Sequence, residues 1–322
     1  MKIDKKSVKR ILVITLTNIG DIILTTPVIS VLKGNFPGAR LDVMAGPLGK
    51  DIFIHDPGIN KVIIYNKHIP LQRKIGLIKK LKNERYDLIV DLKNTLFPVL
   101  IGSRYASPFL SAPPKDITYK RDVHLWRLSA LGIDTRDVPL SIYMSKEDED
   151  YVERLLKDIP NKNFVAVSPA SKSLIKIWDE RGFAEVCDRL INDLNVSVIM
   201  AGDKSDRIFI NGITSAMKEK AYNLAGMTTI PQLVGLFRKS SLVITNDSAP
   251  MHAAAAAGAK ILAIFGPTDP EKYGPRGEGV RIIRRDLPCS PCEVAQCRYN
   301  HECMKLILAD EVYNAAREIL AR

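Results

Sequence analysis

A β-branched run that ends in Asn-Asp-Ser and opens into an alanine-rich segment constrains this chain more than any other stretch. Residues 241–245 read as a buried strand, residues 246–248 as a turn, residues 249–258 as a small-residue helix, and residues 260–265 as a second strand. Strand, helix and strand in this order form a βαβ unit, whose turn lies at the carboxyl end of the first strand. Ligands bind at that end of a parallel sheet, so this turn is the first candidate site.

The residues of the turn favour an anion as ligand. Asp247 and Ser248 can cap the helix, and the free backbone N–H groups of its first turn lie at the positive end of the helix dipole, which suits a phosphate. His252 follows Ser248 by four residues, so it falls on the same helix face, within reach of such a phosphate. A plain N-cap and a core helix with a satisfied histidine explain the same residues, and both interpretations stay open on these residues alone.

Alternation of strand and helix continues along the chain and predicts two α/β domains. A length of 322 residues exceeds one ordinary core. A second alternating set begins with a strand at residues 164–167, and we place the boundary near Pro160. The expected domains are residues 1–160 and residues 161–322, each a doubly wound sheet. The strands expected in the first domain are residues 11–16, 41–45, 61–65 and 87–92.

Composition and the amino terminus indicate a cytoplasmic protein. No run reaches the roughly 18 apolar residues that a membrane-spanning helix needs, and the apolar run at residues 11–16 is too short for a secretory signal. The chain has five cysteines, an odd number with Cys187 apart from the others, which fits a reducing compartment better than a disulfide framework.

The excess of positive charge is confined to the first half of the chain. Residues 1–140 contain 23 Lys and Arg against 12 Asp and Glu, whereas residues 141–322 contain 24 of each kind, so the net charge of +11 arises entirely before residue 141. Such a half attracts a large anionic partner, a phosphorylated lipid surface or a nucleic acid, or it is a solvated surface without a partner.

Residues 71–85 form the most basic amphipathic stretch of that half. Leu71, Ile75, Ile78 and Leu81 fall on one helix face, with arginine and lysine elsewhere. The helix could rest on anionic headgroups, but packing on its own sheet with the lysines in water is the more common arrangement.

Three motifs carry a resemblance to a known family. Residues 246–252 (Asn-Asp-Ser-Ala-Pro-Met-His), 265–270 (Phe-Gly-Pro-Thr-Asp-Pro) and 273–275 (Tyr-Gly-Pro) resemble the nucleotide-sugar box of the ADP-heptose:lipopolysaccharide heptosyltransferases, glycosyltransferase family 9. Ala249 stands where the family usually has glycine, which keeps the N–H but adds a methyl beside the pyrophosphate. The resemblance covers nearly the whole chain. It implies the GT-B fold, two Rossmann-like doubly wound domains facing each other across a cleft, with a return of the last helix, residues 310–322, to the first domain left open.

The resemblance also implies a catalytic base. Residues 18–27 resemble the amino-terminal motif of the family, in which the aspartate corresponding to Asp21 takes the proton from the acceptor hydroxyl. Asn18 and Gly20, in the same turn, are then expected to contact the acceptor. For an isolated Gly-Asp after a strand, helix capping would be an equally good explanation.

A second family element implies the rest of the donor site. The Lys-Ile-Trp at residues 176–178 follows a loop with Ser168 and Ser171 and resembles the Lys-x-Trp element of the family, in which the lysine neutralises the pyrophosphate. The expected donor-binding residues are Ser168, Ser171, Lys176, Asp247, Ser248, Ala249 and His252.

No metal ion or cofactor is assigned to the reaction. The Asp-x-Asp spacing at residues 148–150 falls on a charged helix, and Asp203 with Asp206 is better explained as a loop near the nucleotide. We therefore expect transfer without metal, with Lys176, His252 and the helix amino terminus in the role that Mg²⁺ would have. The resemblance implies inversion at the anomeric carbon.

A compact cysteine cluster is the remaining chemical feature. Its C-x2-C-x4-C-x5-C spacing suits four thiolates around Zn²⁺ or an Fe–S cluster. Related heptosyltransferases carry similar cysteine-rich stretches without a role in the family mechanism, so the cluster stays a candidate only. Its members are Cys289, Cys292, Cys297 and Cys303.

Together these features predict an inverting glycosyltransferase that moves heptose from ADP-heptose to the lipopolysaccharide inner core. Its expected partners are an ADP-activated sugar and an anionic lipid-linked oligosaccharide, with peripheral contact at the cytoplasmic face of the inner membrane. A nucleotide-sugar-binding module without transferase activity, and a transferase for another sugar or acceptor, remain alternatives. A nucleic-acid partner is not expected, because basic and aromatic residues are rarely interleaved.

Overall fold

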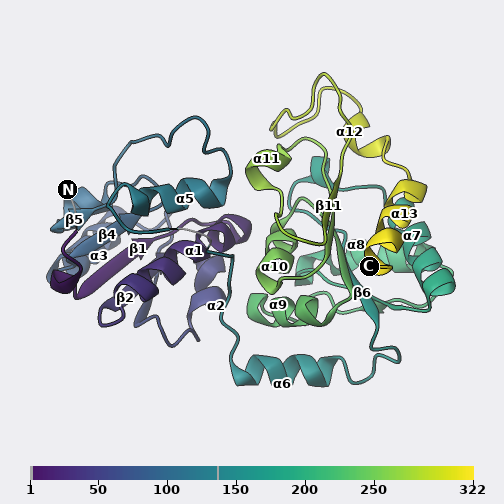
Figure 1. Ribbon diagram of the computed structural model, residues 1–322, viewed down its shortest axis with the longest axis horizontal. Coiled ribbons are helices and arrows are strands. Elements are labelled where there is room, and N and C mark those ends of the chain that lie inside the picture. The colour runs from purple at the N-terminus through teal and green to yellow at the C-terminus, as the bar shows by residue number, and fades with distance from the viewer. Residues whose placement is uncertain (1–2, 136–137) are drawn as a thin grey trace. The chain divides into compact units, whose positions relative to one another are not determined.

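The computed structural model describes residues 3–135 and 138–322. The chain divides into two compact units, Met1–Tyr143 and Met144–Arg322, each built on its own sheet (Figure 1). Both sheets are parallel in every pairing, and helices cover their faces, so the expected pair of α/β domains is confirmed. In the part of the chain that the structure describes, no helix combines the length and the apolar character needed to cross a membrane.

The first unit has five strands in the order β3-β2-β1-β4-β5. The central strand β1 reads Arg-Ile-Leu-Val-Ile and is buried from its second residue onward, because a parallel strand covered on both faces needs a continuous apolar run. The strands are β1 (Arg10–Ile14), β2 (Arg40–Ala45), β3 (Lys61–Ile64), β4 (Leu88–Asp91) and β5 (Tyr105–Ala106). The helices are α1 (Ile19–Asn35), α2 (Lys50–Phe53), α3 (Leu71–Asn83), α4 (Phe97–Ile101) and α5 (Lys120–Ser129).

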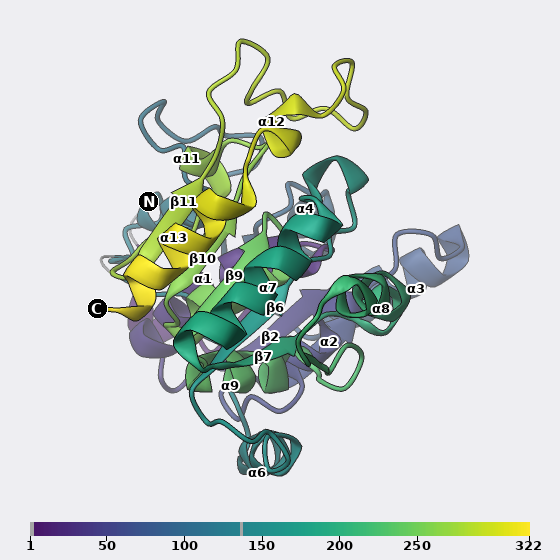
Figure 2. The same ribbon diagram turned by 90° about the vertical axis from the view of Figure 1, so that its right-hand side faces the viewer.

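The second unit has six strands in the order β11-β10-β9-β6-β7-β8. Helices α7, α8 and α13 lie on the face of the sheet turned toward the viewer in Figure 2, and α9 packs beside α10. The strands are β6 (Phe164–Ser168), β7 (Ser197–Met200), β8 (Tyr222–Asn223), β9 (Leu242–Asn246), β10 (Ile261–Ile264) and β11 (Val280–Ile283). The helices are α6 (Lys146–Leu155), α7 (Glu180–Leu194), α8 (Arg207–Ala216), α9 (Ile230–Lys239), α10 (Ala249–Ala257), α11 (Pro270–Tyr273), α12 (Glu302–Lys305) and α13 (Ala309–Leu320).

The order of the strands reverses once in each sheet. In the first unit the chain moves outward from β1 through β2 and β3 and then restarts on the other side with β4. In the second it moves from β6 through β7 and β8 and restarts with β9. Loops diverge at the carboxyl ends of the two strands that flank a reversal, and this leaves a crevice where ligands bind. The loops that border these crevices are those after β1 and β4, and those after β6 and β9.

The division between the units differs from the expected boundary near Pro160. Helix α6 packs on α9, and Gln232 Nε2 donates a hydrogen bond to Asp148 Oδ1 at 3.0 Å. Residues 144–160 therefore belong to the second unit, because the contacts of α6 are made there. The last helix also belongs to this unit: Tyr313 on α13 donates a hydrogen bond to Asp193 on α7 at 2.7 Å.

Helix α3 packs on its sheet with only part of the expected apolar face. Leu81 is buried, and Leu77 and Ile78 pack against the same core cluster, whereas Leu71 and Ile75 are 70% and 45% exposed. The expected apolar face is thus correct only in its carboxyl-terminal half. The first turns of α3 leave apolar side chains in solvent beside arginine and lysine.

Candidate active site

In the second unit, Asn246 ties together the loops after β6 and β9. Its Nδ2 donates to the Pro169 carbonyl oxygen at 2.5 Å, and its Oδ1 accepts from the Trp178 backbone N–H at 3.3 Å. Asn246 is fully buried, so both contacts lie in a low-dielectric setting that strengthens them. The side chain therefore fixes both ends of the residue 169–178 loop against β9.

Lys176 and Asp247 form an ion pair at the strand-order reversal. Lys176 Nζ lies 2.6 Å from Asp247 Oδ2, and the two side chains are 28% and 6% exposed. Asp247 was expected to cap α10, but its carboxylate contacts Lys176. The pair is a ready exchange site, because an incoming phosphate can take over the ammonium group that the carboxylate now neutralises.

The amino terminus of α10 is not capped by a side chain. Ser248 is the N-cap residue but makes no side-chain capping hydrogen bond, so the expected capping by Asp247 and Ser248 is wrong. Ser248 and Ala249 are half-buried at this edge, and their backbone groups lie at the positive end of the helix dipole. His252 is 5% exposed, so very little of its side chain is open to a ligand.

The two serines of the loop after β6 differ in their surroundings. Ser168 is 1% exposed, and its hydroxyl donates to the Ala201 carbonyl oxygen at 3.1 Å, which joins the ends of β6 and β7. Ser171 is half-buried and accepts from the Ser173 backbone N–H at 3.4 Å. Ser171 is thus the serine with an accessible hydroxyl, whereas the Ser168 hydroxyl is used within the sheet.

Asp203 and Asp206 serve the turn after β7. Asp203 accepts from the backbone of Ser205 and Asp206, and Asp206 accepts in return from the Asp203 N–H. Lys172 Nζ contacts Asp203 Oδ2 at 2.5 Å, and this hydrogen bond raises the pKa of Lys172. The two carboxylates therefore stabilise the loop itself, and Lys172 links it to the loop that bears Lys176.

Thr268 is a site residue that the sequence did not single out individually. It lies in the turn after β10, at the same edge of the sheet as the ends of β6 and β9, and is 6% exposed. Within the described residues its hydroxyl has no hydrogen-bond partner, an arrangement that costs free energy unless a ligand supplies one. Its place inside the Phe-Gly-Pro-Thr-Asp-Pro motif was the only available signal.

In the first unit, Asp21 lies in the first turn of α1, directly after the central strand β1. Its Oδ2 accepts a hydrogen bond from Asn18 Nδ2 at 3.1 Å, and Asn18 is the N-cap residue without a side-chain capping bond. Asp21 is half-buried and Asn18 is exposed, while Gly20 forms part of the same helical turn. The carboxylate is therefore held at the strand-order reversal and remains accessible.

A buried arginine organises the loop on the other side of that reversal. Arg127 on α5 is 5% exposed and donates to Asn94 Oδ1 at 2.8 Å and to the Pro108 carbonyl oxygen at 2.7 Å. Asp91, at the end of β4, accepts from the backbone N–H groups of Lys93 and Thr95. Asp91 is thus engaged in structure, which leaves Asp21 as the accessible carboxylate of this pair of loops.

Two solved structures share the fold of this chain. The chain is similar over its full length to a family 9 glycosyl transferase from Veillonella parvula, with 22% identity, a TM-score of 0.87 and 99% of that chain covered. It is also similar to the E. coli ADP-heptose lps heptosyltransferase II, with 22% identity, a TM-score of 0.78 and coverage of 97% and 98% of the two chains. The fold is the GT-B fold of glycosyltransferases.

The sequence then gives the family. Residues 75–302 match the model of glycosyltransferase family 9 (heptosyltransferase). The E. coli protein named lipopolysaccharide heptosyltransferase 3 is 30% identical over 279 residues, which are 78% of this chain and 81% of that protein. The chain belongs to glycosyltransferase family 9 and is a glycosyltransferase of the lipopolysaccharide heptosyltransferase type.

Proposed function

We propose that this glycosyltransferase transfers heptose from ADP-heptose to the lipopolysaccharide inner core, with inversion at the anomeric carbon and without a metal ion. The observation that carries the proposal is the Lys176–Asp247 pair at 2.6 Å beside the uncapped amino terminus of α10. A cation, the Ala249 N–H at the helix amino terminus and a strand-order reversal together suit the pyrophosphate of a nucleotide sugar. The solved E. coli relative is named for ADP-heptose, which motivates the choice of donor.

The leaving ADP needs its developing negative charge stabilised. On donor binding, Lys176 exchanges Asp247 for the pyrophosphate, and the Ala249 N–H at the start of α10 and the Thr268 hydroxyl supply further donors. These groups do the work that a Mg²⁺ ion does in metal-dependent transferases. Ala249 contributes its backbone N–H, and its methyl group narrows the approach of the pyrophosphate.

Asp21 acts as the general base that takes the proton from the acceptor hydroxyl. It is half-buried, is oriented by Asn18, and follows β1 at the reversal of the first sheet. Orientation by one hydrogen bond leaves the second carboxylate oxygen for the substrate, as a base requires. Asn18 and Gly20 border the acceptor at the same turn.

The acceptor half works at the cytoplasmic face of the inner membrane as a peripheral protein. Residues 1–140 carry the whole net charge of +11, and exposed Leu71 and Ile75 adjoin the basic residues of α3. Apolar side chains among lysines suit the boundary between lipid headgroups and acyl chains, and the charge attracts an anionic lipid-linked oligosaccharide.

The direct test is transfer by the purified protein to heptose-deficient lipopolysaccharide, followed as the mass of one added heptose. We expect transfer from ADP-heptose in the presence of EDTA. Product from another ADP-sugar alone would make the protein a transferase of different specificity. Tight ADP-sugar binding without any product would make it a binding module and contradict the proposal.

A further inference from the structure

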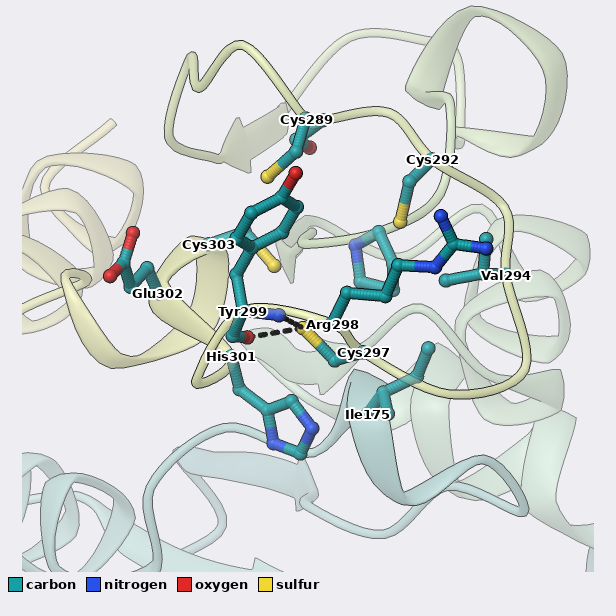
Figure 3. Close-up of a pocket in the computed structure, with 12 residues that line it drawn as sticks. Ile175, Cys289, Cys292, Val294, Cys297, Arg298, Tyr299, His301, Glu302 and Cys303 are labelled. Carbon is teal, nitrogen blue, oxygen red and sulfur yellow. Dashed lines mark hydrogen bonds between the residues drawn. The ribbon is translucent and has the colours of Figure 1, made fainter.

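Four of the five cysteines line one pocket of about 250 Å³ in the second unit (Figure 3). All five cysteines are free thiols. The pocket also borders Ile175, the neighbour of Lys176, and Pro267, in the turn after β10. The four cysteines are Cys289, Cys292, Cys297 and Cys303.

Three of these cysteines are held close to the turn after β10. The Ser290 hydroxyl donates to the Gly266 carbonyl oxygen at 2.6 Å, and the Cys292 N–H donates to the Pro267 carbonyl oxygen at 2.9 Å. Cys303 belongs to α12, and its sulfur lies 3.1 Å from where a Cβ on Gly266 would be. Cys289 directly precedes Ser290. The start of the cysteine loop and α12 therefore meet at the Gly266–Pro267 turn.

Cys297 lies on the irregular part of the loop. Its sulfur accepts from the Tyr299 N–H at 3.3 Å and donates to the Tyr299 carbonyl oxygen. The four cysteine side chains converge on the pocket, whereas the His301 ring is directed away from the sulfur atoms (Figure 3). The nearby histidine is thus poorly placed to replace any of the thiols.

The exposure of these thiols is unlike that of an ordinary core cysteine. Cys187 is buried and its pKa is raised by burial, which keeps it an inert thiol. Cys289, Cys292 and Cys297 are half-buried, where free thiols are open to oxidation. Cys303, the fourth cysteine of the pocket, is buried.

We propose that Cys289, Cys292, Cys297 and Cys303 bind one divalent, thiophilic metal ion, zinc or ferrous iron, in a structural site. Four thiols lose their protons and four metal–sulfur bonds form, so the site takes a net charge of −2 and no electron is transferred. Arg298, which lines the pocket, offsets part of this charge.

Binding requires the sulfur atoms to move inward. Across residues 3–135 and 138–322, no three Cys, His, Asp or Glu side chains already lie in the arrangement of a metal site. Cys297 can make the largest movement, because it gives up only the local contacts with Tyr299, while the other three cysteines lie at or beside anchored positions. The ion then closes the loop that the four cysteines span.

The consequence of the ion is a rigid support beneath the donor loops. The same pocket borders Ile175 and Pro267, and α12 leads to Ile307, whose carbonyl oxygen accepts from Trp178 Nε1 at 3.0 Å. An ion that locks this segment thereby restrains the loop bearing Lys176. This role is separate from the chemistry of transfer, and its test does not depend on activity.

The test is elemental analysis of the full chain purified under reducing, anaerobic conditions from cells supplied with zinc and iron. We expect about one zinc or iron per chain, four thiols protected from Ellman's reagent, and release of the ion with exposure of those thiols when a strong chelator is added. Zinc and iron are told apart in the same measurement. Labile sulfide, with several irons per chain, would replace the single ion by a cluster and contradict the proposal.

Matched variants separate the site from folding. Cys292→Ser and Cys297→Ser should each lower bound metal at least about fivefold, whereas Cys187→Ala, outside the cluster, should keep it. If a variant fails to fold, the protection of thiols in the wild-type chain, measured with and without chelator, still shows whether the cysteines hold a metal ion. Absence of zinc and iron after purification and after reconstitution, with three rapidly reacting thiols, would overturn the site.

Discussion

Trp178 donates a hydrogen bond from its indole Nε1 to the carbonyl oxygen of Ile307 at 3.0 Å, across 129 residues of sequence. The indole is 1% exposed and packs edge to face on Phe183, with ring centroids 4.9 Å apart. Its backbone N–H contacts Asn246, so a single residue joins the donor loop, β9 and the segment before α13. Trp178 is therefore a packing residue on which the position of Lys176 depends.

Replacing Trp178 by phenylalanine should lower the free energy of unfolding by about 1–3 kcal/mol, because the Ile307 carbonyl oxygen loses its donor and the smaller ring leaves a void. Urea denaturation followed by circular dichroism measures this loss. Trp126→Phe, on the half-buried position of α5, is the matched control and should cost less. If the two variants lost the same free energy of unfolding, the hydrogen bond from the Trp178 indole N–H would make no particular contribution to stability.

Asp21→Asn should lower kcat by about 10²–10⁴-fold with little change in donor KM, because the amide cannot accept the acceptor proton. Steady-state transfer assays give both constants. Asp51→Asn, which changes a carboxylate in the first turn of α2, should leave kcat near the wild-type value. An Asp21→Asn enzyme with wild-type turnover would exclude this carboxylate as the base.

Stability of the first unit should fall on acidification because of His124. Burial, followed by the charges of Arg127 and Lys120, lowers the pKa of His124 to about 4. The unfolded chain, with a histidine pKa of about 6.5, binds the proton more readily, so stability is full above pH of about 6.5 and falls as the pH drops toward 4. The loss amounts to at most roughly 3 kcal/mol from this residue.

Urea denaturation between neutral pH and about pH 4.5 tests this expectation. His124→Leu removes the titrating group and should show a smaller loss of stability over the same range. An identical pH dependence in the variant and the wild type would assign the acid sensitivity to other groups. Because α5 packs on α1, unfolding here also affects the turn that carries Asp21.

Reversal of charge on α3 should weaken binding to vesicles that contain anionic lipid. Changing Lys74, Lys79 and Lys80 to glutamate removes three positive charges from the helix that exposes Leu71 and Ile75. Added salt should have a similar effect on the wild type, since it shortens the Debye length to about 4 Å at 0.5 M. The KM for the lipid acceptor should rise several-fold more than that for the nucleotide sugar.

The same charge change in the second unit provides the control. Glutamate at Lys157, Lys204 and Lys218, all exposed, should leave vesicle binding close to that of the wild type. If both triple variants lost vesicle binding equally, or if the wild type bound no vesicles at low salt, the basic residues of the first half would form a solvated surface without a membrane partner.

Local sequence patterns predicted most of the helices and strands, because the pattern of each one is contained in a few consecutive residues. The turn at residues 246–248, the small-residue helix α10 and the apolar strand β1 all appear where their sequences indicate. Strands β5 and β8 have two residues each, too few for any period to be visible. The exposed start of α3 was missed, because its periodic face continues beyond the part that contacts the core.

Contacts between distant residues could not be predicted. Lys176 and Asp247 were both predicted to bind the donor, but their pairing joins positions 71 residues apart and depends on β6 and β9 being neighbours. The same holds for Arg127, whose burial results from two loops that meet above it. Such contacts require strand order, and a single sequence does not contain that order.

Calorimetric titration of ADP into the protein in EDTA tests the donor site most directly. The wild type should bind ADP without metal, and Lys176→Ala should weaken the affinity by about 10- to 100-fold, the loss of one charge-assisted hydrogen bond. Lys172 lies on the same loop as Lys176 but pairs with Asp203. The affinity of Lys172→Ala for ADP should therefore stay within about twofold of that of the wild type. An absolute need for Mg²⁺, or equal affinities for the Lys176 variant and the wild type, would contradict a pyrophosphate site built from Lys176 and the amino terminus of α10.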